Sequence, residues 1–342
     1  MRKILAGLVQ VVLGLVAAAP AQAQSVADFY HGKTMRILIG YGPGTGYDFY
    51  LHALTAHFGA HVPGNPTIVP EYMPGAASLT MMNYLYNVAP RDGTVIGLPE
   101  RNLIVEPLFG NNLAKYDAAK FSWLGSLSRT TSLCMTWRAS GIHTFDDAKT
   151  HKVLLGSTGT SSGSTIFPHL LNKLFGTQFE PLVGYPDSGA IGIAMQNGEV
   201  QGYCSFTLAA TKSAHPDWLN KHEVDILAQL TLKPSAELPN VPLIMDFAKD
   251  DATRKALTLA FADQEIGFPV SAPPDIPADR LQALRTAFDE TLKDPAFLAD
   301  AKQLSIDLVD PVDAARVAKV IQQIYATPPD VVAMVRAIRE GK

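Results

Sequence analysis

The chain has 342 residues, of which 47% are apolar and 18% charged, and its formal net charge is −4. This length and apolar content favour two domains, or one large one, with well-formed hydrophobic cores. A mildly acidic chain has no electrostatic reason to bind nucleic acid or anionic lipid, so we expect neither as a partner.

The first 23 residues follow the pattern of a secretory signal peptide. Arg2 and Lys3 form a basic head, residues 4–19 are apolar, and residues 21–23 read Ala-Gln-Ala, the A-x-A form of a cleavage site. The alternative is an uncleaved membrane anchor, but the apolar run is shorter than the ~20 residues that a spanning helix needs. We therefore predict export, with cleavage after Ala23.

Residues 36–58 predict a strand, a glycine-rich loop and a helix. The apolar run 37–41 has strand length, and it breaks into the loop residues Gly42, Pro43, Gly44, Thr45 and Gly46 before apolar residues repeat at helical spacing. Backbone N–H groups of such a loop point into the crevice above the strand, and the first helical turn adds unpaired donors. The loop can therefore receive an anion, although it can also be a plain turn. Asp48 is expected to cap the helix or restrain the loop.

The same order recurs further along the chain. Residues 67–72 predict a strand, which ends in a loop with Gly75 and Ala76 before a helix over residues 79–88, and residues 94–98 predict a third strand. Arg101 lies just past this third strand, and the carboxyl ends of parallel strands meet at one edge of a sheet. Arg101 is interpreted either as the counter-charge of a ligand carboxylate or as a solvated surface arginine.

The second half repeats this architecture. Extended segments at 123–127 and 133–137 precede a strand at 152–155, a loop of glycine and hydroxyl residues at 156–164 and a helix, and strands at 179–185 and 200–206 enclose another loop and helix. Candidate hydroxyl donors of the two loops are Thr158, Thr160, Ser161, Ser162 and Ser188. The alternative is that these hydroxyls only cap helices. Two such halves predict a small anion held between two α/β domains.

The last third is expected to serve packing. It has predicted strands at 224–229, 243–247 and 266–270, a helix at 251–262 and a linker-like proline-rich stretch at 271–277. Three further helices are predicted, the last of them beginning with Asp310 as N-cap and Pro311 at the first position.

Enzyme and metal sites find weaker support. Residues 159–163 match G-x-S-x-G between a strand and a helix, so a secreted serine hydrolase using Ser161, with Asp187 and either His215 or His222, is the alternative function. No oxyanion element of the HGGG type precedes it. The sequence has no Walker loop, dinucleotide fingerprint or H-E-x-x-H motif, and His57 and His61 are read as exposed histidines.

The two cysteines, Cys134 and Cys204, do not have the spacing of a metal site, so no metal or other cofactor is expected. Export would allow a disulfide between them, and two buried free thiols are an equally good interpretation.

Several of these loops together resemble a known family. The motifs RILI at 36–39 with PGTGYD at 43–48, MPGA at 73–76 and APRDGT at 89–94 are similar to those of the extracytoplasmic solute receptors of tripartite tricarboxylate transporters, the Bug-type receptors. The likeness continues through Gly184-Tyr185, residues 188–190 and 198–200, and the segment 273–280, so it covers essentially the whole mature chain.

The resemblance implies a type II periplasmic binding protein fold of two α/β lobes. Lobe 1 would comprise residues 24–128 and 246–342, with the C-terminal helices, and lobe 2 residues 129–245. It further implies a monomeric periplasmic receptor, not an enzyme, that captures a small organic carboxylate and delivers it to the membrane permease subunits. A sensory partner that binds the ligand but signals would have the same pattern.

The ligand-binding positions implied by the resemblance lie in four loops. They are Gly44, Thr45 and Gly46, then Gly75 and Ala76, then Thr158 to Ser162, and Asp187 with Ser188. The family usually has glycine at position 45 and an alanine-arginine pair where this chain has Leu51-His52, so the usual ligand cannot be assumed. Asp187 in the cleft would repel a second carboxylate or attract an amine.

Overall fold

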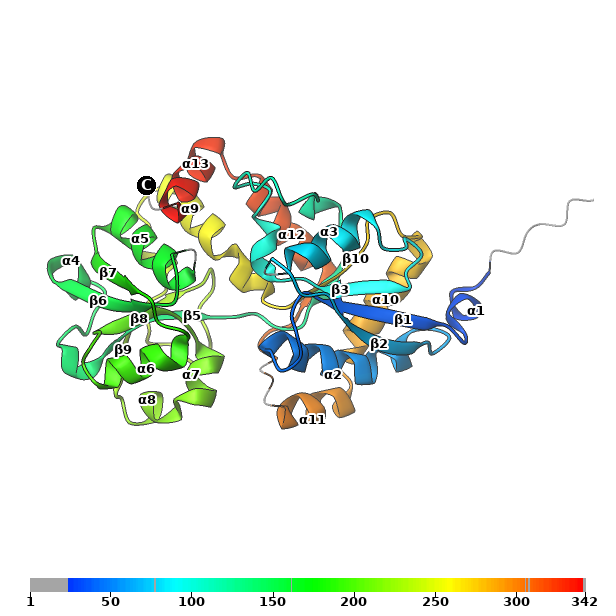
Figure 1. Ribbon diagram of the computed structural model, residues 1–342, viewed down its shortest axis with the longest axis horizontal. Helices are drawn as coiled ribbons and strands as arrows, with labels where there is room; N and C mark the ends of the chain where they lie inside the picture. The colour runs from blue at the N-terminus through cyan, green and yellow to red at the C-terminus, as the bar shows by residue number, and fades with distance from the viewer. Residues whose placement is uncertain (1–23, 77, 161, 305, 307, 341–342) are drawn as a thin grey trace, which may run out of the picture.

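Two β-sheets organise the chain, and each is the centre of one α/β lobe (Figure 1). The computed structural model describes residues 24–340 except 77, 161, 305 and 307. The predicted signal peptide and Ser161 therefore lie outside the described residues. No helix in the described part of the chain combines the length and apolar character needed to cross a bilayer.

Lobe 1 is built on a six-stranded sheet of order β11-β4-β10-β3-β1-β2. Its strands are β1 (Thr34–Ile39), β2 (Thr67–Tyr72), β3 (Val95–Leu98), β4 (Ser122–Ser126), β10 (Pro269–Ala272) and β11 (Val312–Asp313). Strands β1, β2 and β3 are parallel, whereas β10 is antiparallel to both β3 and β4. The three predicted N-terminal strands are thus confirmed as one parallel unit.

Helices cover both faces of the lobe 1 sheet because side chains alternate along its strands. Ile37 and Ile39 pack in one core with Leu54, while Leu38 points into the opposite core with Met82. The helices of this lobe are α1 (Val26–Tyr30), α2 (Gly46–His61), α3 (Leu79–Asn87), α10 (Ala278–Thr291), α11 (Pro295–Gln303) and α12 (Ala314–Tyr325).

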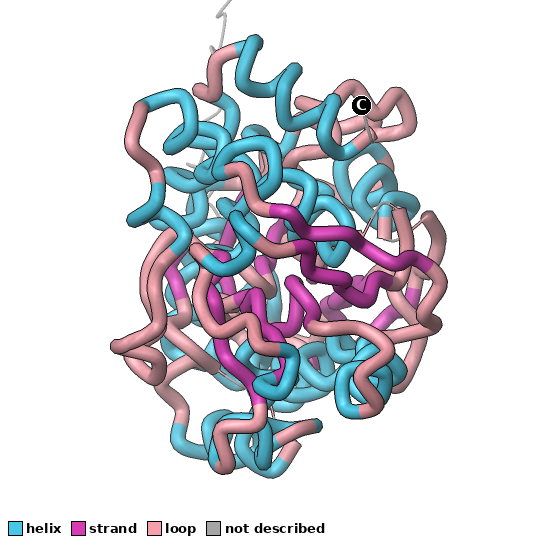
Figure 2. Tube along the Cα trace, turned by 90° about the vertical axis from the view of Figure 1, so that its left-hand side faces the viewer, coloured by secondary structure: helices cyan, strands magenta, loops and turns pink. Residues whose placement is uncertain are grey.

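Lobe 2 repeats the layered arrangement on a five-stranded sheet of order β7-β6-β8-β5-β9. Its strands are β5 (Ser132–Trp137), β6 (Lys152–Ser157), β7 (Gln178–Val183), β8 (Gly202–Thr207) and β9 (Val224–Leu230). Its helices are α4 (Asp147–Thr150), α5 (Gly163–Phe175), α6 (Ser188–Gln196), α7 (Leu208–Ala214) and α8 (Pro216–Asn220). Seen from the end of this lobe, the strands lie inside a layer of helices (Figure 2).

Two further helices, α9 (Asp251–Phe261) and α13 (Pro329–Arg339), pack against each other above the junction of the lobes (Figure 1). In α9, Leu259 belongs to a lobe 1 core and Leu257 to a lobe 2 core. In α13, Val335 belongs to the lobe 1 core and Ile338 to the lobe 2 core. These helices therefore bridge the lobes.

Two connecting segments run side by side between the lobes. The first joins β4 to β5, and the second runs from the 3-10 helix Ala262–Ile266 into β10. The Leu127 N–H donates to the Phe268 carbonyl at 3.0 Å, and the Thr130 N–H donates to the Gln264 carbonyl at 2.9 Å. Hydrogen bonding thus ties the two connections into one hinge.

Three expectations for the last third are wrong. Residues 243–247 are not a strand: Ile244–Phe247 is a 3-10 helix, because the preceding loop wraps around the buried Gln229 amide, which bonds the Leu238 and Val241 carbonyls. The stretch 271–277 is no linker, since Ser271 lies fully buried in β10 at the centre of the sheet.

The third of these errors concerns the start of α12. The N-cap is Asp313, whose carboxylate accepts from the Arg316 N–H at 2.7 Å, whereas Asp310 forms an ion pair with Arg129 at 3.0 Å.

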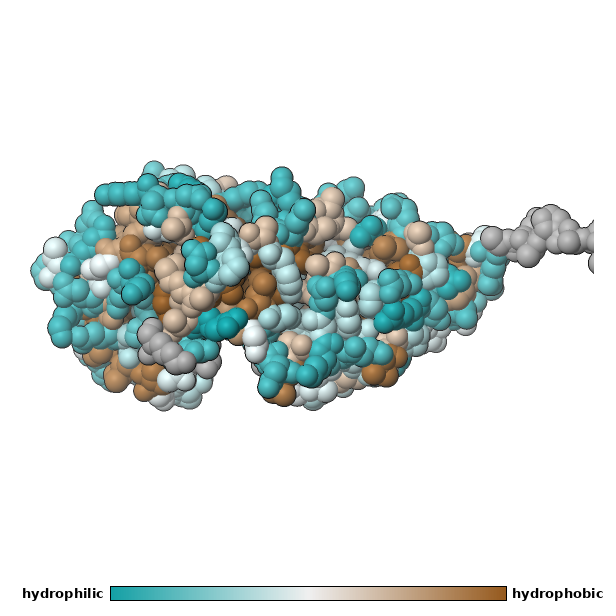
Figure 3. All heavy atoms as spheres, turned by 90° about the horizontal axis from the view of Figure 1, so that it is seen from above, coloured by the Kyte–Doolittle hydropathy of each residue, from teal (hydrophilic) through white to brown (hydrophobic). Residues whose placement is uncertain are grey.

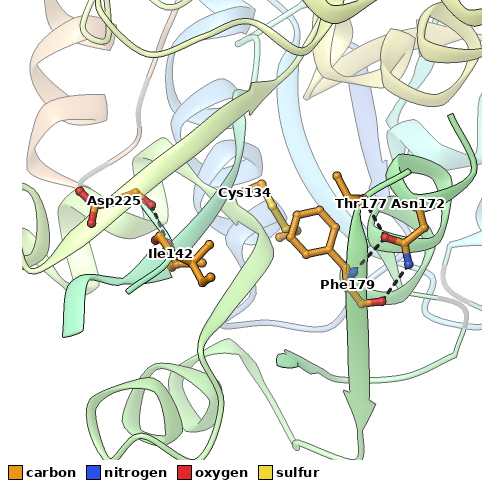
Figure 4. The surroundings of a disulfide bond; sticks show 8 residues. Cys134, Ile142, Asn172, Thr177, Phe179 and Asp225 are labelled. Atoms are coloured by element: carbon orange, nitrogen blue, oxygen red, sulfur yellow. Dashed lines mark hydrogen bonds between the residues drawn. A yellow bond between two sulfur atoms is a disulfide. The ribbon is translucent and has the colours of Figure 1, made fainter. Parts of the chain in front are cut away.

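Cys134 and Cys204 form a disulfide between adjacent strands β5 and β8. Both residues are fully buried, and Figure 4 shows the Phe179 ring beside the bond. Of the two interpretations of the sequence, the structure has the disulfide rather than free thiols.

Removal of this disulfide is expected to lower the free energy of unfolding by about 2–4 kcal/mol, because it closes a long loop of the unfolded chain. The measurement is urea unfolding of the protein with and without reductant, and of a Cys134→Ala, Cys204→Ala variant. Reductant should leave the double variant unchanged, which serves as the control. An unfolding midpoint of the unsubstituted protein that ignores reductant would contradict the prediction.

Candidate functional site

Residues that follow the carboxyl ends of β1, β2 and β3 line a cavity between the lobes. This cavity has a volume of about 540 Å³ and includes Tyr41, Ala76 and Glu100 from lobe 1 with Gly163 and Ser205 from lobe 2. We call it the Glu100 cavity. The space-filling view shows the molecule hollowed between its two lobes (Figure 3).

A second cavity, of about 590 Å³, also lies between the lobes. Its lining combines apolar residues such as Phe49 and Leu298 with the cations Arg129, Lys212 and Lys302. We call it the Arg129 cavity. Arg101 lines both cavities.

Arg101 begins the 3-10 helix Arg101–Ile104, which directly follows β3, and its backbone N–H donates to the Tyr47 hydroxyl at 3.3 Å. Its Nε donates to the Asp263 carboxylate at 3.2 Å, and only 19% of the side chain is exposed. Within the described residues, the two terminal nitrogens of Arg101 have no hydrogen-bond partner. The guanidinium thus offers its outer edge to the space between the lobes.

Burial shapes the charge of this pair. It raises the pKa of Asp263 above its ordinary value, and the neighbouring Arg101 offsets part of that rise. Burial also works against the charge of Arg101, but Glu100, Tyr47 and Asp263 outweigh it and keep the pKa of Arg101 above its ordinary value. Arg101 is therefore a permanent cation in the lining of both cavities.

The loop before α2 is held by Asp48. The Asp48 carboxylate accepts from the Gly44 N–H and from the Tyr72 hydroxyl, both at 2.7 Å, and lies 3.3 Å from the His52 imidazole. The Thr45 hydroxyl donates to the Gly42 carbonyl at 3.1 Å. Asp48 restrains the loop, as predicted, and occupies the Gly44 donor that a ligand would need.

Asp48 should make stability depend on pH in the acid range. Burial alone would raise its pKa, but the hydrogen bonds from Gly44 and Tyr72, with His52, outweigh burial and hold the pKa below its ordinary value. A lowered folded-state pKa contributes stability that is full above the ordinary aspartate pKa of about 4 and is lost as pH falls through the lowered value.

We expect the Asp48→Asn variant to lose this contribution. Its melting temperature should lie below that of the unsubstituted protein at pH 7, and the gap should narrow as the pH falls below about 4. Melting curves measured from pH 7 to pH 3 test this. A gap that stays constant with pH would contradict it.

The loop between β2 and α3 is tightly packed on the end of β1. Gly75, Ala76 and Ser78 all have positive φ, of 147°, 46° and 75°. A side chain on Gly40 would overlap Ser78, so glycine is required there. This packing places Ala76 in the lining of the Glu100 cavity, whereas Gly75 lines neither cavity.

Hydroxyls of the loop between β6 and α5 are largely engaged with one another. The Ser162 hydroxyl donates to the Gly159 carbonyl at 2.7 Å and lies 2.6 Å from the Ser164 hydroxyl, while Thr165 donates to the same carbonyl at 2.8 Å. Thr160 is exposed. Internal bonds of this kind leave the loop fewer hydroxyl donors than its composition indicates.

The structure therefore brings only some of the candidate residues together. Ala76 and Arg101 meet in the Glu100 cavity, and Gly46 is the first residue of α2. Candidates that line neither cavity are Gly44, Thr45, Gly75, Thr158, Thr160, Ser162, Asp187 and Ser188. Their contact with a ligand stays a prediction.

The partners proposed for a serine nucleophile have other contacts. Asp187 caps α6 by accepting from the Ala190 N–H at 2.8 Å, and the His215 ring stacks on Trp218 with centroids 3.9 Å apart. No described group of three or more His, Cys, Asp or Glu residues could hold a metal ion.

His57 and His61 are not exposed histidines, because α10 and α11 cover them. Their side chains are 15% and 23% exposed, and they bond the carboxylates of Asp300 at 2.7 Å and Asp294 at 3.0 Å.

Asp263 is a site residue that no sequence pattern could identify. It lies 162 positions from Arg101, and no local pattern links the two residues.

The sequence matches no protein-family model and none of the curated proteins. Its fold, however, is shared by solved structures. A TctC solute-binding protein from Polaromonas, solved without ligand, has a TM-score of 0.72 at 13% identity, over 92% of this chain and 100% of its own.

Two further structures contain ligands. Rpa4515 from R. palustris, with adipate, has a TM-score of 0.60 at 16% identity, over 89% of this chain and 97% of its own. MatC from Rhodopseudomonas palustris, with bound malate, has a TM-score of 0.57 at 17% identity, over 88% of this chain and 99% of its own. At these identities the likeness shows the fold alone, and it confirms the predicted type II periplasmic binding protein fold.

Proposed function

We propose that this chain is a periplasmic solute receptor of the tripartite tricarboxylate transporter type, which captures a small organic carboxylate between its lobes. The observation that carries the proposal is Arg101, a largely buried and permanent cation that lines both cavities and whose two terminal nitrogens have no described partner. A guanidinium edge matches the geometry of a carboxylate and bonds it through two parallel N–H groups.

The fold supports this proposal. Proteins of the same fold carry adipate and malate in their solved structures. A ligand that contacts both lobes stabilises the closed arrangement over the open one, so capture shifts a population between two states. The proposal has four further parts. The protein is exported through a signal peptide and is monomeric. It binds its ligand without converting it and transfers it to membrane permease subunits.

The lobe boundaries are part of the same proposal. With these boundaries, every strand of each sheet falls in one lobe. Lobe 1 comprises residues 24–128 and 246–342, and lobe 2 comprises residues 129–245. The bridging helices α9 and α13 fall in the lobe 1 range and contribute to both cores.

A thermal-shift screen over organic acids tests the function. A ligand that binds only the native state stabilises the protein, and the gain grows with the logarithm of the ligand concentration divided by Kd. A bound acid should therefore raise the melting temperature of the protein by several degrees. Sugars and inorganic cations serve as controls and should give no shift. Clear shifts from sugars or cations, with none from any acid, would overturn the proposal.

A further inference from the structure

Charge is distributed unevenly around Arg101. The described lining of the Glu100 cavity holds three carboxylates and two guanidinium groups, from Glu100, Glu106, Asp263, Arg101 and Arg339. The described lining of the Arg129 cavity holds four cationic side chains, counting Arg101, and no aspartate or glutamate. One side of Arg101 is therefore acidic and the other basic.

The cations of the Glu100 cavity are already paired with acids. Arg339 contacts Glu106 at 2.7 Å, and Arg101 contacts Asp263 at 3.2 Å. Glu100 is the remaining carboxylate, and it makes no ion pair with a described residue. Arg101 is therefore shared between Asp263 and Glu100, and the cavity has one carboxylate more than it has cations.

Glu100 is held in place by neutral donors. Its carboxylate accepts from the Tyr41 hydroxyl at 2.8 Å and from the Asn102 N–H at 3.5 Å. The side chain is half-buried, and its charge adds to the rise in the pKa of the nearby Asp263, behind burial itself. A second carboxylate placed here would be repelled by two acids, whereas an ammonium group would be attracted by both.

We infer that the ligand is an aminocarboxylate, with its ammonium group in the Glu100 cavity beside Glu100 and Asp263 and its carboxylate on the outer edge of Arg101. This inference rests on the proposed function and narrows its substrate class from organic acids to zwitterions. A dicarboxylate satisfies Arg101 equally well, but it leaves the excess negative charge of the cavity unbalanced and adds a negative group next to Glu100. The charge pattern thus selects the ligand by its amine.

Matched pairs of acids test the inference, because each pair differs only in the amino group. The probes are alanine and propionate, aspartate and succinate, glutamate and glutarate, and phenylalanine and 3-phenylpropionate, with dissociation constants measured by calorimetry. Since a hydrogen bond to a charged group accounts for roughly tenfold or more in affinity, at least one amino acid should bind that much more tightly than its partner acid.

The Glu100→Gln variant locates the effect. It keeps the shape of the side chain and removes the charge, so the ratio of the two affinities within a pair should fall, while the remaining charge of Asp263 keeps it above one. Glu180→Gln is the matched control, because Glu180 lies on the edge strand of lobe 2, paired with Lys152 and outside both cavities. This control should keep the ratio of the unsubstituted protein.

The failure of the inference and the failure of the proposed function give different results. If acids without an amino group bind as tightly as the amino acids, or if Glu100→Gln leaves the ratio unchanged, the inference is overturned and the receptor function stands. If no acid of either kind binds, both are overturned.

Discussion

Replacement of Arg101 by glutamine is expected to lower the affinity for a carboxylate ligand by about 3–5 kcal/mol, roughly a hundredfold to several thousandfold. Two parallel charge-assisted hydrogen bonds would be lost, in a site where only 19% of the arginine side chain is exposed. Arg101→Lys should show a smaller loss, because an ammonium keeps the charge but not the planar pair of donors.

Asp263 complicates this experiment, because removal of Arg101 leaves a buried carboxylate without its partner. The measurement should therefore be made in an Asp263→Asn background, where both charges of the pair are absent. Arg91→Gln is the matched control: Arg91 belongs to the same lobe, but it is 48% exposed and paired with Asp275 away from both cavities. Calorimetry that finds equal affinities for the Arg101 and Arg91 variants would rule out Arg101 as the ligand anchor.

Glu265→Gln is expected to lower the free energy of unfolding by about 3–5 kcal/mol, because it removes the charge that compensates a buried cation at the hinge. The Glu265 side chain is fully buried and accepts from Arg129 at 2.8 Å and from Arg316 at 2.9 Å, with Lys233 at 3.8 Å. Arg129 is itself only 9% exposed. Without Glu265, Arg129 would lose its buried partner and face Arg316 and Lys233, whose side chains are 30% and 52% exposed.

Asp310 provides the matched control, because it pairs with the same arginine from the surface. It lies 3.0 Å from Arg129 and its side chain is 74% exposed, so Asp310→Asn should cost less than about 1 kcal/mol. Chemical denaturation of the two variants, monitored by circular dichroism, measures both values. Equal losses would show that burial of Glu265 does not govern the stability of the hinge.

The fold could be predicted largely because its signals are local. Glycine loops between apolar runs and helical repeats mark the units β1 to α2 and β6 to α5, and β2 has the bounds that its sequence predicts. The errors arise where distant contacts override local pattern. Residues 243–247 look like a strand but form a 3-10 helix after a loop that wraps around Gln229, and Ser271 and Ala272 of the predicted linker belong to a central strand.

The site was harder to predict for the same reason. The position of Arg101 after β3 left two interpretations open, a carboxylate anchor and a solvated arginine. The burial of Arg101 and its bond to Asp263 argue against the second, and its contact with a ligand stays a prediction. The hydroxyls near Ser162 illustrate the opposite case. The composition of this loop predicts hydroxyl donors for a ligand. In the structure these hydroxyls bond the Gly159 carbonyl and one another.

The bridging helices α9 and α13 have a mechanical consequence. Since buried side chains of both helices belong to the cores of both lobes, a rotation that separates the lobes along this face would expose apolar surface, which is unfavourable. Rotation about an axis close to these helices avoids that exposure. Opening should consequently widen the gap between the lobes most on the side opposite α9 and α13. Solute should enter and leave on that side.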